Sequence, residues 1–316
     1  MVLSTWRPSA DREALLARAE LLSQTRAFFD ARQLIEVETP LLARCGVTDP
    51  ALEPFIVDSD PPRYLQTSPE YAMKRLLAAY PMDMYQICKA FRADELGGRH
   101  NPEYTLLEWY RIDWDYCRLI REVAELLCQL LGRSGWHVWS WAALFDTILG
   151  IDGHGADRTT LLQIANRHLT APPSDLDRDG LLDLLMSHCI EPSIADWGMV
   201  FVVDYPVSQA ALAREIIRDN TVVGARFECY VDGIELANGY WEASDADLLR
   251  ERFEKDNQIR AQRGLAQRPV DERLLAAQAA GLPNCAGVAL GFDRLLALRL
   301  GRQEIQSSLA FGWEHV

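Results

Sequence analysis

The chain has 316 residues, 49% hydrophobic and 25% charged, which is typical of a globular protein able to bury a substantial core. A net charge of −14 without any Lys/Arg-rich run disfavours extended binding of tRNA or DNA, because such binding needs a basic footprint. No apolar run reaches membrane-span length, and the N-terminus lacks an apolar signal core. We therefore expect a cytoplasmic protein. The seven cysteines form no C-x-x-C pair, so neither a disulfide framework nor a zinc site is indicated.

The first half of the chain is predicted to form a helix followed by antiparallel strands. Apolar periodicity predicts a helix over residues 10–32, and "QLIEVETPLL" is expected to be a strand that Pro40 ends. "TSPEYAMKRLLAA" should begin a short helix, with Ser68 as the cap and Pro69 in the first turn. "DMYQICKAFRADE" and "PEYTLLEWYRIDWDY" are predicted strands joined by "LGGRHN", and the next helix should stop at Gly132.

The second half is predicted to contain a helical insertion and a second hairpin. Residues at about 145–197 read as helices around the polar loop "APPSDLDRDG", and "MVFVVDYP" reads as a strand. In "RFECYVDGIELANGYWE", Asp232-Gly233 is a strong two-residue turn signal. Helices at about 245–263 and 271–280 precede "GVALGFDRLLALRLG", a strand that runs into a helix. Hairpins with helices that do not strictly alternate indicate an α+β fold, an antiparallel sheet flanked by helices.

Charged and aromatic side chains alternate in the first hairpin. Alternate residues of a strand share a face, so Tyr104, Glu108 and Tyr110 should point one way, and Arg92 and Asp94 share a parity. From these residues alone, a solvated face with weak cross-strand ion pairs and a binding site are equally good interpretations.

The second hairpin carries two acids near its turn. With Asp232-Gly233 as the turn, Tyr230 should face Glu235 and Glu228 should face Ala237. Glu228 and Glu235 are then diagonal neighbours within reach of one Mg²⁺ ion, although two exposed acids on a sheet remain the alternative.

Further along the same strand, the polar residues have the opposite parity from Glu235. For both sets to line one site, the strand needs a kink or bulge, which we expect at residues 237–239. The residues concerned are Asn238, Tyr240 and Glu242.

Together these segments resemble the catalytic core of class II aminoacyl-tRNA synthetases over nearly the whole chain. "FFDARQLIEVETPLL" is similar to the first motif, which builds the dimer interface, "FRADE...RHNPEYTLLEWY" to the second and "GVALGFDR" to the third. "RHNPE", "YPVSQAALA" and "GIELANG" are most similar to the stand-alone relatives of lysyl-tRNA synthetase, the elongation factor P–(R)-β-lysine ligases. The resemblance implies a homodimer with one catalytic domain over residues 1–316. It also implies that no anticodon-binding domain is present, since the first-motif helix starts near residue 10.

The resemblance also implies roles for matching residues. The catalytic cations that stabilise phosphate charge would be Arg92 and Arg294, and Mg²⁺ would bind Glu228 and Glu235. The ATP-binding residues would be Arg92, Asp94, His100, Asn101, Tyr104, Glu235, Leu236, Gly291 and Arg294. The amino-acid substrate would meet Ser68, Pro69, Glu70, Glu108, Tyr110, Asn238, Tyr240, Glu242 and Ala289.

Two positions depart from the family pattern. The second motif reads "RADE", with Asp94 where Glu is usual. The Asp94 side chain is one methylene shorter, so either it reaches its ligand less well or Glu95 shares its role. Ala289 stands where lysyl-tRNA synthetases tend to have glycine, and its methyl group would narrow the α-amino side of the pocket in favour of a β-amino acid.

The expected reaction is ATP-dependent activation of (R)-β-lysine as an acyl-adenylate, followed by transfer to a lysine ε-amine of elongation factor P. Two alternatives stay open. One is a truncated enzyme that activates α-lysine for tRNA or another acceptor, and the other is a catalytically silent regulatory paralogue.

Overall fold

The computed structural model describes residues 6–316, which form two compact units. The first unit extends to Trp114 and also takes in Glu125–Arg133 and Ser244–Val316, while the second comprises Asp115–Ala124 and Ser134–Ala243. The helix α3 (Tyr116–Leu131) contributes residues to both. Within the described range, no helix combines the length and apolar character needed to cross a bilayer. The single domain expected over residues 1–316 stays a prediction.

The first unit is built on four strands in the order β1 (Ile35–Glu36), β5 (Met84–Phe91), β6 (Glu103–Ile112) and β12 (Cys285–Gly291). The antiparallel pairing of β5 with β6 confirms the predicted first hairpin. The strand expected in "QLIEVETPLL" is only two residues long, and it pairs in parallel with β5. A small second sheet holds β2 (Leu42–Ala43), β4 (Arg63–Leu65) and β3 (Ile56–Val57).

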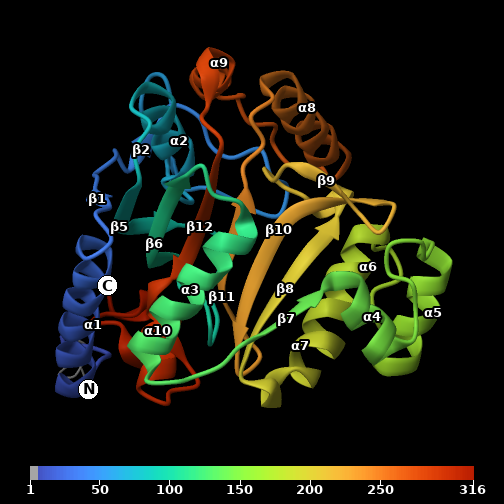
Figure 1. Ribbon diagram of the computed structural model, residues 1–316, viewed down its shortest axis with the longest axis horizontal. Helices are drawn as coiled ribbons and strands as arrows, with labels where there is room; N and C mark the ends of the chain where they lie inside the picture. Colours follow the sequence, from blue (N-terminus) through green and yellow to red (C-terminus); the bar gives the residue numbers. More distant parts are fainter. Residues whose placement is uncertain (1–5) are drawn as a thin grey trace. The chain divides into compact units, whose positions relative to one another are not determined.

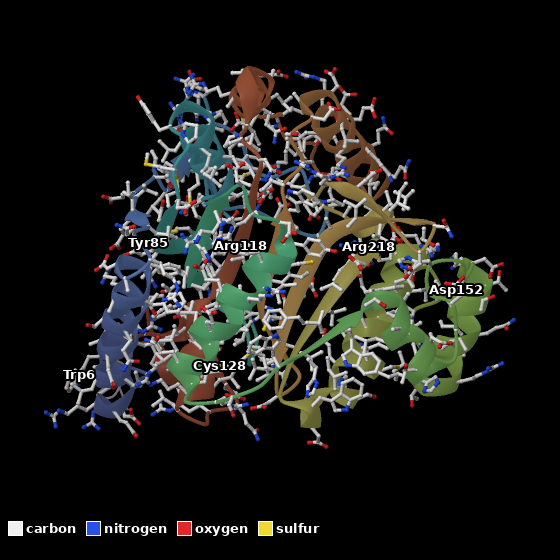
Figure 2. All side chains as sticks on the ribbon, viewed as in Figure 1. Trp6, Tyr85, Arg118, Cys128, Asp152 and Arg218 are labelled. Atoms are coloured by element: carbon white, nitrogen blue, oxygen red, sulfur yellow. The ribbon has the colours of Figure 1, made fainter. Side chains whose placement is uncertain are left out.

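The helices of this unit pack against its strands or against one another. They are α1 (Arg12–Asp30), α2 (Glu70–Ala79), α8 (Ala246–Gln262), α9 (Glu272–Gly281) and α10 (Phe292–Arg299). Tyr85 of β5, labelled in Figure 2, stacks on Phe29 of α1 with ring centroids 4.6 Å apart, so α1 is fixed to the strand that leads into the second motif.

The start of α2 differs from the prediction in one detail. Pro69, rather than Ser68, occupies the N-cap position, and no side chain caps the helix. Ser68 therefore lies one residue too early to bond the first-turn amides, and the expectation that it caps α2 was wrong.

The second unit contains β11 (Ile234–Trp241), β10 (Thr221–Val231), β8 (Met199–Pro206) and β7 (His137–Ser140) in that order, with β9 (Glu215–Arg218) also paired to β10. The predicted insertion is helical, as α4 (Trp141–Leu149), α5 (Arg158–His168), α6 (Arg178–Leu185) and α7 (Glu191–Ser193). Figure 1 shows these helices gathered beside β7 and β8. Their apolar faces share a core with Val200, Val202 and Tyr205 of β8.

The α+β fold class is confirmed, since most strand pairs within the two units are antiparallel, whereas β1–β5 and β7–β8 are parallel. The turn between β10 and β11 is also confirmed. Asp232 has φ 52° and Gly233 has φ 71°, and positive values at both positions are what a type I′ hairpin turn requires.

Candidate active site

Arg92 lies directly after the last residue of β5. Its Nη1 donates to Oε1 of Glu95 at 3.0 Å, and its guanidinium carbon lies 5.4 Å from the centre of the Tyr104 ring. Asp94 is exposed and lies beyond the end of the strand at Phe91, so strand parity does not relate it to Arg92. Glu95 is thus the acid that contacts Arg92, and the role of Asp94 stays a prediction.

Arg294, in the first turn of α10, contacts His100 of the loop between β5 and β6. Its Nη2 lies 2.6 Å from His100 Nε2, and its Nε donates to the Arg99 carbonyl at 3.2 Å. A guanidinium can only donate, so His100 Nε2 must accept, which requires a neutral imidazole. Burial and the Arg294 charge both lower the pKa of His100, which agrees with a neutral ring. The structure therefore brings these two predicted ATP-binding residues together, beside Gly291 at the N-cap of α10.

Asn101 is hydrogen-bonded within the protein. Its Nδ2 donates to the Glu103 carbonyl at 2.6 Å, and its Oδ1 accepts from Gln306 Nε2 at 3.2 Å and from the Trp313 amide at 3.1 Å. This buried side chain anchors the C-terminal segment. The second hydrogen of Nδ2 is not used by these bonds, so the assigned contact of Asn101 with ATP stays a prediction.

Glu108 and Tyr110 lie on one face of β6, as strand parity predicts. The Tyr110 hydroxyl donates to Glu108 Oε1 at 2.7 Å, and both side chains are buried. Ala289 of β12 pairs directly with Glu108 and is partly exposed. A buried carboxylate beside an accessible small residue is a suitable receptor for an ammonium group.

Glu70 begins α2 and already holds a cation. Its Oε1 accepts from Lys74 Nζ at 2.6 Å, and the Lys74 side chain is entirely buried. Pro69 is buried before it, and Ser68 is half-buried. A substrate ammonium at Glu70 would therefore share the carboxylate with Lys74.

In the second unit, a bulge sets the faces of the second hairpin. Tyr230 pairs with Glu235 as predicted, but Glu228 pairs with Asn238 and not with Ala237. The register shifts because Leu236 is an extra residue on β11, just before the expected position at 237–239. An extra residue reverses the parity of everything after it.

The bulge therefore gathers side chains that strict alternation would separate. Tyr240 pairs with Arg226, so it lies on the same face as the Glu228–Asn238 and Tyr230–Glu235 pairs. Glu242 follows β11 and is buried, with 1% of its surface exposed.

Glu228 is surrounded by donors. Its Oε2 accepts from the Tyr205 hydroxyl at 2.7 Å and from Tyr230, and its Oε1 accepts from Arg226 and from Asn238 Nδ2 at 3.4 Å. Burial, followed by the Glu228 charge, raises the pKa of both tyrosines far above its ordinary value, so both hydroxyls remain protonated donors.

The acids of this hairpin fit Mg²⁺ by the chemistry of their donor atoms. Glu228 and Glu235 supply hard oxygens from one sheet face, which suits Mg²⁺. A carboxylate has about four lone-pair sites, so a metal at Glu228 must displace one of its present donors. No three acidic, His or Cys side chains in residues 6–316 are grouped to hold a metal, so further ligands would come from nucleotide phosphates or water.

A cavity of about 530 Å³ opens beside this hairpin. Its lining includes Arg226, Glu228 and Glu235 from the hairpin, with Asp183 and Glu191 from the insertion. Neither of these two acids was among the site residues predicted from the sequence. Asp183 lies on α6 in "DRDGLLDLL", where an acid within an apolar helical pattern was the available signal.

Comparison with known proteins agrees with the resemblance drawn from the motifs. The profile of "tRNA synthetases class II (D, K and N)" matches residues 2–315. The chain is 45% identical over 314 residues to "Elongation factor P--(R)-beta-lysine ligase" of Mannheimia succiniciproducens, covering 97% of both chains. It is 44% identical to the protein of the same name from Pasteurella multocida over 317 residues, covering 98% of both.

The matched residues 2–315 include both hairpins that carry the candidate site residues. Membership implies use of ATP. The chain is a ligase that belongs to the class II tRNA synthetase family of the D, K and N type, as a near relative of the elongation factor P–(R)-β-lysine ligases.

Proposed function

We propose that this protein uses ATP and Mg²⁺ to activate (R)-β-lysine and transfers it to a lysine ε-amine of elongation factor P. The observation that carries the proposal is identity of 45% over 97% of both chains to a ligase of that name. A match of this extent includes all three motif regions. Elongation factor P and β-lysine would be the partners, and the homodimer expected from the first motif stays part of the proposal.

The residues support an in-line displacement on ATP. The carboxylate of the amino acid attacks the α-phosphorus, and pyrophosphate leaves. The acceptor amine then attacks the acyl carbon, loses a proton and expels AMP. Arg92 and Arg294 supply cationic donors for phosphate oxygens, and neutral His100 keeps Arg294 oriented.

The substrate has two ammonium groups, and the first unit contains an acid suited to one of them. Glu108 is almost wholly buried, with 2% exposed. A buried carboxylate gains most from a cationic ligand, because little water competes for it. Bound Mg²⁺ would neutralise phosphate charge, with Glu235 as the first protein ligand and Glu228 as the second.

Mass spectrometry of elongation factor P tests the proposal. After incubation with the protein, ATP and (R)-β-lysine, we expect the mass of one β-lysyl group on a single lysine, with little added by L-α-lysine. ATP–pyrophosphate exchange with each isomer measures activation separately from transfer.

Two matched variants control the assay. Arg92→Met should abolish exchange, whereas Arg250→Met should not, since Arg250 is an exposed arginine paired with Glu272 on the surface. Preference for α-lysine would favour the truncated synthetase instead. Absence of exchange with either isomer would favour the silent paralogue.

A further inference from the structure

Gln86 of β5 is buried without hydrogen bonds. Only 2% of the residue is exposed, and within residues 6–316 neither Oε1 nor Nε2 of its amide has a hydrogen-bond partner. Leaving a buried amide unsatisfied costs about 1–3 kcal/mol for each group. An orphaned amide in a native interior therefore needs an explanation, and a ligand that completes its bonds is one.

The neighbours of Gln86 in the sheet indicate which ligand could complete its hydrogen bonds. Gln86 pairs with Glu108 on β6, and Glu108 pairs with Ala289 on β12. Directly paired residues point to the same face with their Cβ atoms about 5 Å apart. The three residues form one row across the sheet, buried at Gln86 and Glu108 and partly exposed at Ala289.

The nearest protein neighbours do not satisfy this amide. Cys88 shares the face two residues along, but its Sγ accepts from Gln66 Nε2 at 3.4 Å. Burial, followed by the Glu108 charge, raises the pKa of the Cys88 thiol to about 12, although the amides of Gln86 and Gln66 act in the opposite direction. The thiol therefore stays neutral, and a neutral thiol is a poor partner for an amide.

We propose that Gln86 is a specificity-determining residue for the amino-acid substrate: its Oε1 accepts a hydrogen bond from the ammonium group that Glu108 binds. This inference rests on the proposed function. A neutral acceptor is favourable at position 86, because a second carboxylate about 5 Å from Glu108 would repel the Glu108 charge. Glu108 supplies the charge, and Gln86 fixes where the ammonium lies.

Gln86→Met tests the inference in ATP–pyrophosphate exchange. Methionine has a similar shape, and replacing an unsatisfied amide by an apolar group should leave the melting temperature unchanged or higher. We expect KM for (R)-β-lysine to rise about 10- to 100-fold, since hydrogen bonds to charged groups contribute that much. KM for ATP and kcat should stay within about twofold, because the lost contact is to the amino acid alone.

The matched control is Gln278→Met, which removes another buried glutamine, on α9 and outside the row. It should change KM for (R)-β-lysine less than about twofold. Two substrate analogues show which of the two ammonium groups contacts Gln86, since 6-aminohexanoate lacks the β-amine and 3-aminohexanoate lacks the ε-amine. The penalty of Gln86→Met should vanish with one of them.

Three results overturn the inference. An unchanged KM in Gln86→Met, with active wild-type protein, removes the role of Gln86 and leaves the proposed function intact. Equal penalties with both analogues and with (R)-β-lysine would show a general structural effect. Wild-type protein that exchanges with neither lysine isomer removes the proposed function, and this inference with it.

Discussion

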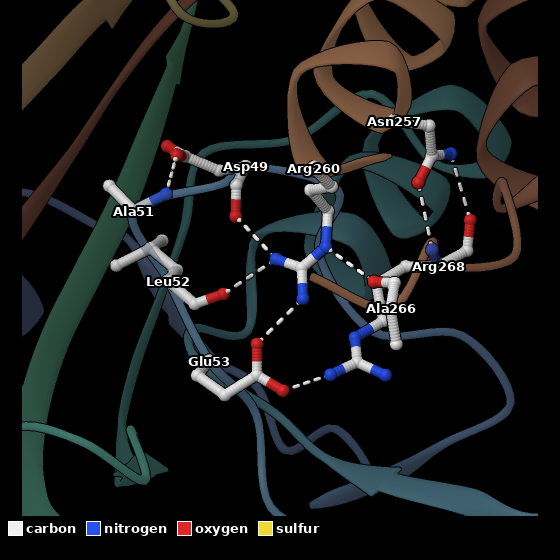
Figure 3. Close-up of polar contacts among 8 residues, drawn as sticks. All are labelled: Asp49, Ala51, Leu52, Glu53, Asn257, Arg260, Ala266 and Arg268. Atoms are coloured by element: carbon white, nitrogen blue, oxygen red, sulfur yellow. Dashed lines mark hydrogen bonds and ion pairs between the residues drawn. The ribbon is translucent and has the colours of Figure 1, made fainter. Parts of the chain in front are cut away.

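One carboxylate holds two nearly buried arginines in the first unit, which makes Glu53 a sensitive position. Glu53 Oε2 accepts from Arg260 Nη2 at 2.6 Å, and its Oε1 accepts from Arg268 (Figure 3). The Arg260 side chain is 0% exposed and that of Arg268 is 5% exposed, whereas Glu53 is 30% exposed. Glu53→Gln would leave two guanidiniums facing a neutral amide.

The magnitude follows from the partners that remain. Arg260 keeps the carbonyls of Ala266 at 2.7 Å and Asp49 at 3.1 Å as acceptors. Arg268 loses its acid, and its Nε has no hydrogen-bond partner in the described chain. Breaking a buried pair costs about 3–5 kcal/mol, and the partial exposure of Glu53 reduces this to about 2–3 kcal/mol. The melting temperature should fall by about 5 °C or more.

Urea unfolding followed by circular dichroism measures the loss. Glu272→Gln is the control, because Glu272 pairs with the exposed Arg250 and should cost less than about 0.5 kcal/mol. Adding Arg268→Met to Glu53→Gln removes the stranded charge and should recover part of the loss. If Glu53→Gln costs no more than Glu272→Gln, the assignment of a buried ionic network is wrong.

Three more predictions concern the site and the pH dependence of stability. Arg294→Lys keeps the charge but loses the planar fork that contacts His100 and Arg99, so KM for ATP in exchange should rise about tenfold; an unchanged value would remove the ATP contact. Glu235→Gln should raise the Mg²⁺ concentration for half-maximal exchange about tenfold. Glu228→Gln should in addition lower the melting temperature, because it strands Arg226; equal melting temperatures for the two variants would contradict this. Burial raises the pKa of Asp256 from 3.8 to about 6, so ionising it destabilises the fold as pH rises from about 4 to 6. Asp256→Asn, which can still accept from Thr48, should therefore be about 1–2 kcal/mol more stable than wild type at pH 7.5 and no more stable at pH 3.5; a gain that is the same at both pH values would refute the titration.

Local patterns predicted the elements with strong signals of their own. The strand β8 matches "MVFVVDYP" residue for residue, and Asp232-Gly233 forms the expected turn. The short strands β7 and β9 were not predicted. Each has four residues, and they are defined by pairing with β8 and β10, which local sequence does not encode.

The candidate site likewise combines features that local sequence predicts with features that depend on distant residues. Parity along β6 correctly placed Glu108 beside Tyr110, because regular strands alternate. The need for a bulge on β11 was also predicted correctly, but its position was not. The bulge was predicted at residues 237–239, which include Gly239, but Gly239 pairs regularly with Phe227. The extra residue is instead the buried Leu236. The contacts of Asn101 with Gln306 and Trp313 could not be predicted, because these partners are distant in sequence, and its role in binding ATP stays a prediction.

Because Leu236 is an extra residue on β11, the number of residues in this strand decides which side chains of the second hairpin share a face, more than the identity of Leu236 does. Another apolar side chain could replace Leu236 without changing which groups point together. Deleting it would rotate every later position by half a period, sending Asn238 and Tyr240 to the reverse side from Glu228 while leaving both strands intact. The polar groups of the altered hairpin would then face two separate surfaces, and the buried Ala237 would leave its present packing, so we expect this variant to be less stable than the wild type.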